Sequence, residues 1–92
     1  MLRIWGKIYK NNKLINDTVI ENNSKTMDFT TKIDMVMEEL CLYFDLQKPL
    51  WLNENLKDLN RFSRTVFTQS HFIEEINFDY LEIEIIENTD PE

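Results

Sequence analysis

Residues 2–9 read LRIWGKIY and residues 77–87 read NFDYLEIEIIE, and these two stretches decide the fold. In both, apolar and polar side chains alternate, which is typical of a β-strand with one buried face. The apolar faces consist of Leu2, Ile4 and Ile8 in the first stretch and Leu81, Ile83 and Ile85 in the second. The opposite faces carry Arg3, Trp5, Lys7 and Tyr9 in the first and Tyr80, Glu82 and Glu84 in the second.

The charges of these two strands are complementary. Residues 1–16 contain basic side chains and no acid, whereas residues 72–92 contain eight acids and no Lys or Arg. Opposite charges that face each other on neighbouring strands contribute about 0.2–1 kcal/mol per pair. We therefore expect the two strands to be neighbours in the centre of one sheet.

A hairpin is expected next to the first strand. Asn tolerates positive φ angles, so Asn11-Asn12 suits a two-residue turn between the first strand, residues 2–9, and a second strand, residues 14–21. A regular register then pairs residues in five places: Lys10 with Lys13, Tyr9 with Leu14, Ile8 with Ile15, Trp5 with Thr18, and Ile4 with Val19.

From about Thr30 the hydrophobic period becomes helical, and it continues until Pro49 disfavours helical geometry. Thr31 and Asp34 resemble a weak capping box at its start. The apolar stripe comprises Phe29, Ile33, Val36, Met37, Leu40, Cys41 and Phe44. It is widened by Met35, Leu42, Tyr43 and Leu46. We expect this extra width to be covered by the next segment or by a second subunit.

The rest of the chain contains shorter elements. Asn53 is a good N-cap for a short helix over residues 54–60, residues 63–68 form a third strand, and Ser70 begins a single turn. We therefore expect an α+β fold: a four-stranded antiparallel sheet in β-β-α-α-β-β order, packed on one main amphipathic helix. Residues 1–87 would form this single domain, and residues 88–92 a flexible C-terminal tail.

Composition excludes several classes of protein. A net charge of −7 argues against a protein that binds nucleic acid through its phosphates. One Gly excludes Gly-rich phosphate loops, and no stretch approaches the ~20 apolar residues of a membrane helix. The N-terminus interrupts its apolar residues with charges, unlike a secretory signal, and a single cysteine fits a reducing cytoplasm.

We expect no catalytic set, cofactor or metal site. His71 and Cys41 are the only residues of their kinds, so one chain supplies two such zinc ligands at most. The acids nearest Cys41 in sequence do not favour a reactive thiolate. The pair Glu82 and Glu84 has a spacing that acid–base chemistry can use, but a solvated strand face explains it more simply.

Two groups of residues are candidates for binding. Arg61, Arg64 and His71 belong to an acid-free segment, and two arginines can hold a carboxylate or phosphate. The alternative is that they neutralise the acids that follow. The aromatic residues Trp5, Trp51 and Tyr80 are candidates for a protein interface. For Trp51, between two leucines, the alternative is a place in the core.

Several strings resemble a small uncharacterised family of low-GC Gram-positive bacteria whose members have about this length. They are Phe44-Asp45-Leu46, Pro49 and Trp51-Leu52, then Phe67-Thr68-Gln69 and Phe72-Ile73-Glu74, and finally Phe78-Asp79-Tyr80-Leu81-Glu82. The resemblance covers nearly the whole chain and implies that the chain is a complete protein. It implies no activity and no functional residues.

These observations favour a non-enzymatic cytoplasmic protein that acts through protein–protein contacts, with a homodimer as one form of such contact. A module that binds a small anionic ligand through Arg61 and Arg64 is the second hypothesis. An acidic inhibitor that mimics nucleic acid, using the acids of residues 72–92, is the third, and an enzyme is the fourth.

Overall fold

The chain forms one α+β domain with a four-stranded antiparallel sheet and two α-helices. This computed structural model describes residues 1–89. In chain order the elements are β1 (Leu2–Lys10), β2 (Lys13–Asn22), α1 (Phe29–Phe44), α2 (Asn53–Phe62), β3 (Arg64–Phe67), the 3₁₀ turn η1 (Gln69–His71) and β4 (Tyr80–Asn88). The fold class is as predicted. The order differs from β-β-α-α-β-β because η1 separates the last two strands. Packing on one main helix is not confirmed, because α2 also lies against the sheet, at β3.

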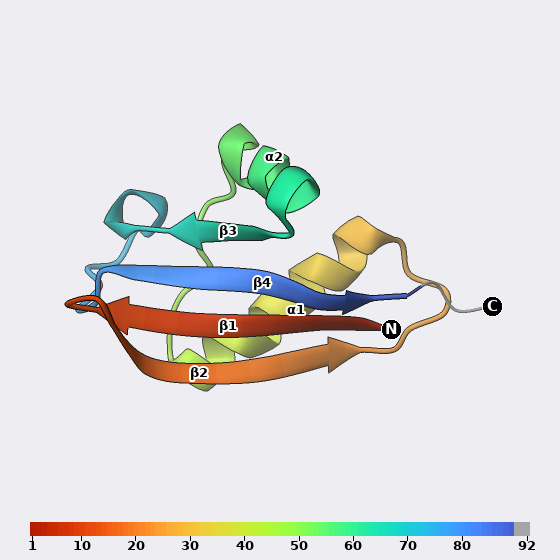
Figure 1. Cartoon of the computed structure of the whole chain (residues 1–92), viewed down its shortest axis with the longest axis horizontal. Helices are drawn as coiled ribbons and strands as arrows, with labels where there is room; N and C mark the ends of the chain where they lie inside the picture. Colours follow the sequence, from red (N-terminus) through yellow and green to blue (C-terminus); the bar gives the residue numbers. More distant parts are fainter. Residues whose placement is uncertain (90–92) are drawn as a thin grey trace.

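The strands lie in the order β2-β1-β4-β3 (Figure 1), so β1 and β4 are the two central strands. The sequence prediction that these strands are neighbours is confirmed. Their antiparallel register places Lys7 opposite Glu82. Basic and acidic side chains therefore face each other in the middle of the sheet.

The hairpin forms at Asn11 and Asn12, whose φ angles are 53° and 64°. The pairs nearest the turn agree with the prediction, but the register shifts between Ile8 and Tyr9. Beyond this bulge Ile8 faces Asn16, Trp5 faces Val19 and Ile4 faces Ile20. The predicted pairs Ile8–Ile15, Trp5–Thr18 and Ile4–Val19 are therefore wrong. The extra residue lets Ile20 turn towards the core and leaves Val19 on the other face of the sheet.

Helix α1 begins earlier than predicted, because Asp28 and not the Thr31–Asp34 pair caps it. The Thr31 backbone N–H donates to Asp28 Oδ1 over 2.8 Å. Hydrogen bonding from the Thr31 side chain and from this backbone N–H holds the pKa of the Asp28 carboxyl below its usual value. The helix ends well before Pro49: Asp45 adopts a left-handed conformation, with φ 58°, and its N–H bonds the carbonyls of the last turn.

The hydrophobic core lies between the sheet and α1, which crosses behind the strands (Figure 1). Its buried apolar residues are Leu2, Ile4, Ile8, Ile33, Val36, Met37, Leu40, Cys41, Leu59, Phe67, Phe72, Leu81 and Ile83. At Gly6 the side chain of Leu40 packs directly against the backbone of β1, because an added Cβ would lie 2.6 Å from Leu40 Cδ1. A glycine in the middle of a central strand is thus the contact point for α1.

Helix α2 lies beside the edge strand β3. Its N-cap is Leu52 and not Asn53 as predicted. The capping acceptor is Asn55 Oδ1, which receives the Leu52 N–H over 2.9 Å. The helix continues to Phe62, beyond the predicted end at Asn60, and stops where Ser63 becomes left-handed at φ 59°.

The two ends of the described chain lie side by side. Asn88 is the last residue of β4, and the Thr89 N–H donates to the Met1 carbonyl over 2.9 Å. Of the predicted tail at 88–92, residues 90–92 lie outside the described residues. Within residues 1–89, no helix has the length and apolar character needed to cross a membrane.

Candidate functional site

The face of the sheet that points away from α1 is the candidate site. Residues directly opposite each other across strands share a face, so the register defines this surface. We call it the open face; it comprises Arg3, Trp5, Lys7, Tyr9, Leu14, Asp17, Val19, Glu21, Arg64, Val66, Tyr80, Glu82, Glu84 and Glu87. In Figure 1 the strands pass in front of α1, so the open face looks towards the viewer.

Lys7 lies at the centre of the open face and is buried, with 6% of its surface exposed. Its ammonium lies 3.0 Å from Glu82 Oε2, 2.9 Å from Glu84 Oε1 and 3.9 Å from the centroid of the Trp5 ring. Burial opposes the charged form, but the hydrogen bonds and charges of the two carboxylates outweigh it and raise the pKa of Lys7. Lys7 is therefore a fixed cation that holds the surrounding side chains in place, not a nucleophile.

The aromatic residues of the open face are held in defined positions. The rings of Tyr9 and Tyr80 stack with centroids 5.0 Å apart. The Trp5 indole N–H donates to Asp17 Oδ2 over 2.8 Å. All three rings are half-buried. Each thus presents one side to solvent while a neighbour fixes the other, which lowers the entropy lost on binding a partner.

A pocket of about 480 Å³ opens where the open face meets α2. Its lining comprises Asp58, Phe62, Arg64, Thr65, Val66, Thr68, Tyr80 and Glu82. Phe62 and Val66 are 60% and 40% exposed, which is high for apolar side chains. One cation, Arg64, stands against the carboxylates of Asp58 and Glu82, so the charged lining has a net negative balance.

The predicted ligand residues do not converge. Arg64 lines the pocket, whereas Arg61 lies on α2 with its guanidinium 5.8 Å from the centroid of the Phe62 ring. His71 is buried: its Nδ1 accepts the Thr68 N–H over 3.1 Å, and its ring meets Phe67 edge-on. Among residues 1–89 its Nε2 has no hydrogen-bond partner.

The predicted interface residues separate into two groups. Trp5 and Tyr80 both lie on the open face, four strand positions apart along the β1–β4 pairing. Trp51 lies elsewhere, half-buried with its ring edge-on to Phe67. On α1, Leu42 is 78% exposed, so part of the wide apolar stripe has no cover among the described residues.

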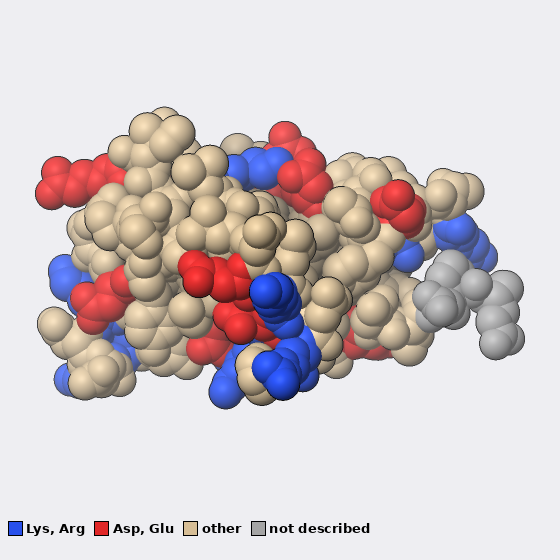
Figure 2. Space-filling view, turned by 90° about the horizontal axis from the view of Figure 1, so that it is seen from above, with Lys and Arg blue, Asp and Glu red and all other residues tan. Residues whose placement is uncertain are grey.

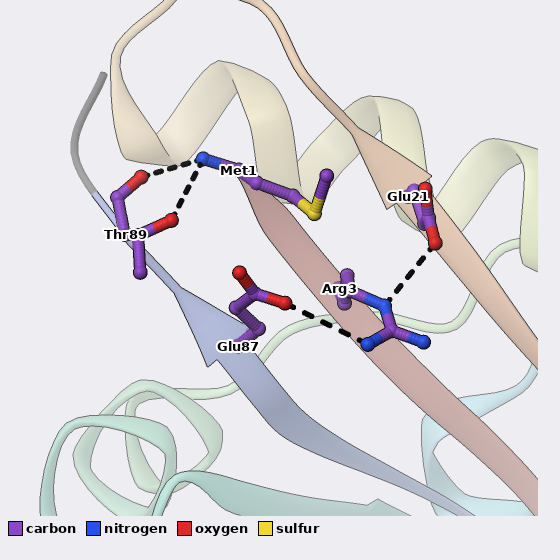
Figure 3. Close-up of polar contacts among 5 residues, drawn as sticks. All are labelled: Met1, Arg3, Glu21, Glu87 and Thr89. Atoms are coloured by element: carbon purple, nitrogen blue, oxygen red, sulfur yellow. Dashed lines mark hydrogen bonds and ion pairs between the residues drawn. The ribbon is translucent and has the colours of Figure 1, made fainter. Parts of the chain in front are cut away.

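The edge of the open face is closed by ion pairs at the ends of the strands (Figure 3). Arg3 lies between two acids, 3.2 Å from Glu21 and 3.6 Å from Glu87, and so links β2, β1 and β4. The Met1 ammonium bonds the carbonyl and, over 3.3 Å, the hydroxyl of Thr89.

Seen from above, acidic and basic side chains are intermingled and form no field of one sign (Figure 2). On the open face, Glu21 and Glu87 pair with Arg3, and Glu82 and Glu84 pair with Lys7.

A second hollow of about 390 Å³ lies between the hairpin, the end of α1 and the segment before β4. Asp45, Glu74 and Glu75 are at its lining, yet within residues 1–89 no cluster of three or more His, Cys, Asp or Glu is arranged to hold a metal. Cys41 is buried, and burial raises the pKa of its thiol to about 11. This side chain is chemically inert at neutral pH.

Sequence reasoning did not single out Lys7, Tyr9, Phe62 or Val66. For the first two a signal existed, because strand alternation places them on the same face as Trp5. Phe62 belongs to the site only because α2 runs past Asn60. In comparisons with known proteins, the chain matches no family, no curated protein and no solved structure.

Proposed function

We propose that this protein is a non-enzymatic, cytoplasmic binding module that recognises another protein through the open face. One observation carries the proposal: Trp5, Tyr9 and Tyr80 are half-exposed, rigidly supported aromatic rings beside a pocket whose lining combines the apolar side chains of Phe62 and Val66 with polar and charged groups. Fixed aromatic anchors next to a partly apolar pocket are typical of the energetic centre of a protein interface.

The pocket between α2 and β3 suits an apolar side chain of the partner. Phe62 and Val66 supply exposed apolar surface. Tyr80, whose ring stacks on Tyr9, also lines the pocket. Arg64, Asp58 and Glu82 stand around this surface and can bond polar groups of the partner's backbone. An apolar anchor surrounded by mixed charges is the chemistry of a protein surface.

The other hypotheses have less support. An anionic ligand would meet more negative than positive charge in this pocket, and Arg61 lies outside its lining. A mimic of nucleic acid needs free carboxylates, but Glu82, Glu84 and Glu87 are engaged by Lys7 and Arg3.

The test compares three immobilised proteins: the wild type, Val66→Asp on the open face and Leu42→Asp on α1. Each substitution places a carboxylate at an exposed apolar site, so general effects of added charge are matched. After exposure to an extract of the source cells, we expect one protein to be retained equally by the wild type and Leu42→Asp. Retention on Val66→Asp should fall roughly tenfold or more.

The partner identified in this way is then purified and titrated by calorimetry against the same three proteins. The proposal requires that Val66→Asp weakens the purified interaction and that Leu42→Asp does not. If every retained protein is bound equally by all three, the open face is not the binding surface.

A further inference from the structure

The outer edge of β2 is a second surface available for contact. Of the two edge strands, β3 has four residues and is flanked by α2, whereas β2 has ten. Within residues 1–89, β2 pairs only with β1. A long edge strand exposes a row of backbone donors and acceptors that can pair with another strand.

The hydrogen bonds at the two ends of β1 identify the backbone groups of β2 that do not bond β1. The carbonyls of Tyr9 and Met1 accept N–H groups from the β4 side of β1. Because backbone direction alternates along a strand, the even-numbered residues of β1 bond β2. Their partners on β2 include Thr18 and Ile20. The N–H and C=O groups of Asp17, Val19 and Glu21 therefore point outward, away from β1.

The acidic side chains of β2 do not prevent another strand from pairing with this edge. Asp17 accepts the Trp5 indole N–H, and Glu21 pairs with Arg3, so both carboxylates are directed towards β1. The apolar side chains remain outside: Ile15 is 55% and Val19 40% exposed. Natural edge strands usually place charges where this strand exposes aliphatic groups.

We propose that a second copy of this chain binds the β2 edge, with the two β2 strands antiparallel and centred on Thr18. This register places Asp17 opposite Val19 of the partner subunit, so outward-facing backbone groups meet each other. A shift of two residues in one direction would place Asp17 opposite Asp17 of the partner subunit. The same shift in the other direction would place Asp17 opposite Glu21 of the partner subunit. The register centred on Thr18 avoids both like-charge pairs directly opposite each other. Its regular ladder covers residues 16–20, which lie beyond the bulge in both copies.

The position of α1 is compatible with this pairing. The helix crosses the sheet obliquely, with its C-terminal end behind β2 and its N-terminal end towards β4 (Figure 1). In the dimer, the C-terminal end of one α1 lies next to the end of the partner subunit's β2 that has no helix behind it. The result is one eight-stranded sheet with both open faces on the same side. The contact uses the strand edge, so it stands apart from the proposed function of the open face.

The oligomeric state tests this inference directly. In sedimentation equilibrium we expect the wild type to be a dimer, and Val19→Asp to raise the dissociation constant about tenfold or more, because two acid–acid pairs appear per dimer. Val66→Asp is the matched control, since Val66 is also 40% exposed on the same face. A monomeric wild type at hundreds of micromolar would overturn the proposal. So would a dimer that Val66→Asp dissociates and Val19→Asp leaves intact.

A cross-link tests the register. Thr18 lies on the axis as a pair without mutual backbone bonds, where Cα atoms are about 4.5 Å apart, within the range of a disulfide. Thr18→Cys should form a disulfide-linked dimer under mild oxidation, whereas Thr26→Cys in an exposed loop should not. Cys41 gives little background because it is buried. A folded Thr18→Cys protein that cross-links no faster than Thr26→Cys would exclude this register, and the binding test with Val66→Asp would be unaffected.

Discussion

At the scale of single residues, the contact between Gly6 and Leu40 sets how closely α1 approaches the sheet. A Cβ at Gly6 would lie 2.6–2.9 Å from three side-chain atoms of Leu40, which is itself fully buried. Overpacking of this kind costs about 1–3 kcal/mol. We expect Gly6→Ala to lower the free energy of unfolding by this amount, measured by urea denaturation followed by circular dichroism.

The same contact offers a control through a double-mutant cycle. Leu40→Ala alone should cost about 2–5 kcal/mol because it leaves a cavity. In the double variant the new methyl group enters that cavity, so the combined cost should be smaller than the sum of the two single costs. Strict additivity would show that Gly6 is not the point of close approach. An isolated glycine in a strand pattern is a sequence signal for such a contact, but the opposing residue is known only from the packing.

At the scale of elements, a small polar network attaches α2 to β3. Asn55 is 2% exposed, and its Nδ2 donates to Thr65 Oγ1 over 2.9 Å and to the Val66 carbonyl over 3.1 Å. Asn55→Asp keeps the shape but removes both donors, so buried acceptors lose their partners at about 1–3 kcal/mol. We expect the melting temperature to fall for Asn55→Asp and to change little for Asn60→Asp at an exposed position of the same helix. Equal shifts would contradict a special role for Asn55.

The strands and helices also show how much of the fold could be predicted from the sequence. The strands β1 and β4 follow from strict alternation, and their adjacency follows from opposite charges on equivalent faces. The register of β2 could not be derived, because the bulge at Ile8 is a compromise between the turn at Asn11 and the burial of Ile20. The pocket was missed for a related reason: it needs α2 to reach Phe62 and to lie against β3. Both depend on tertiary packing, which local periodicity does not contain.

At the scale of the whole molecule, the central pairing of β1 with β4 joins the basic start of the chain to its acidic end through Lys7. Because the folded pKa of Lys7 is raised above 10.5, its contribution to stability is complete below that pH. It is lost as the pH rises through the folded pKa. Lys7→Met should therefore cost roughly 1–3 kcal/mol at pH 7, since it leaves two carboxylates together without their cation.

The difference in unfolding free energy between the wild type and Lys7→Met should then shrink as the pH rises above about 10.5, measured by urea denaturation across the alkaline range. Lys10→Met, at an exposed position of the same strand, serves as the control for general deprotonation of lysines. Its difference from the wild type should be small and vary little with pH. If the two variants follow the same pH profile, Lys7 does not join the two ends of the chain electrostatically. In that case Lys7 would not hold Glu82 and Glu84 together at the centre of the open face, which is the proposed binding surface.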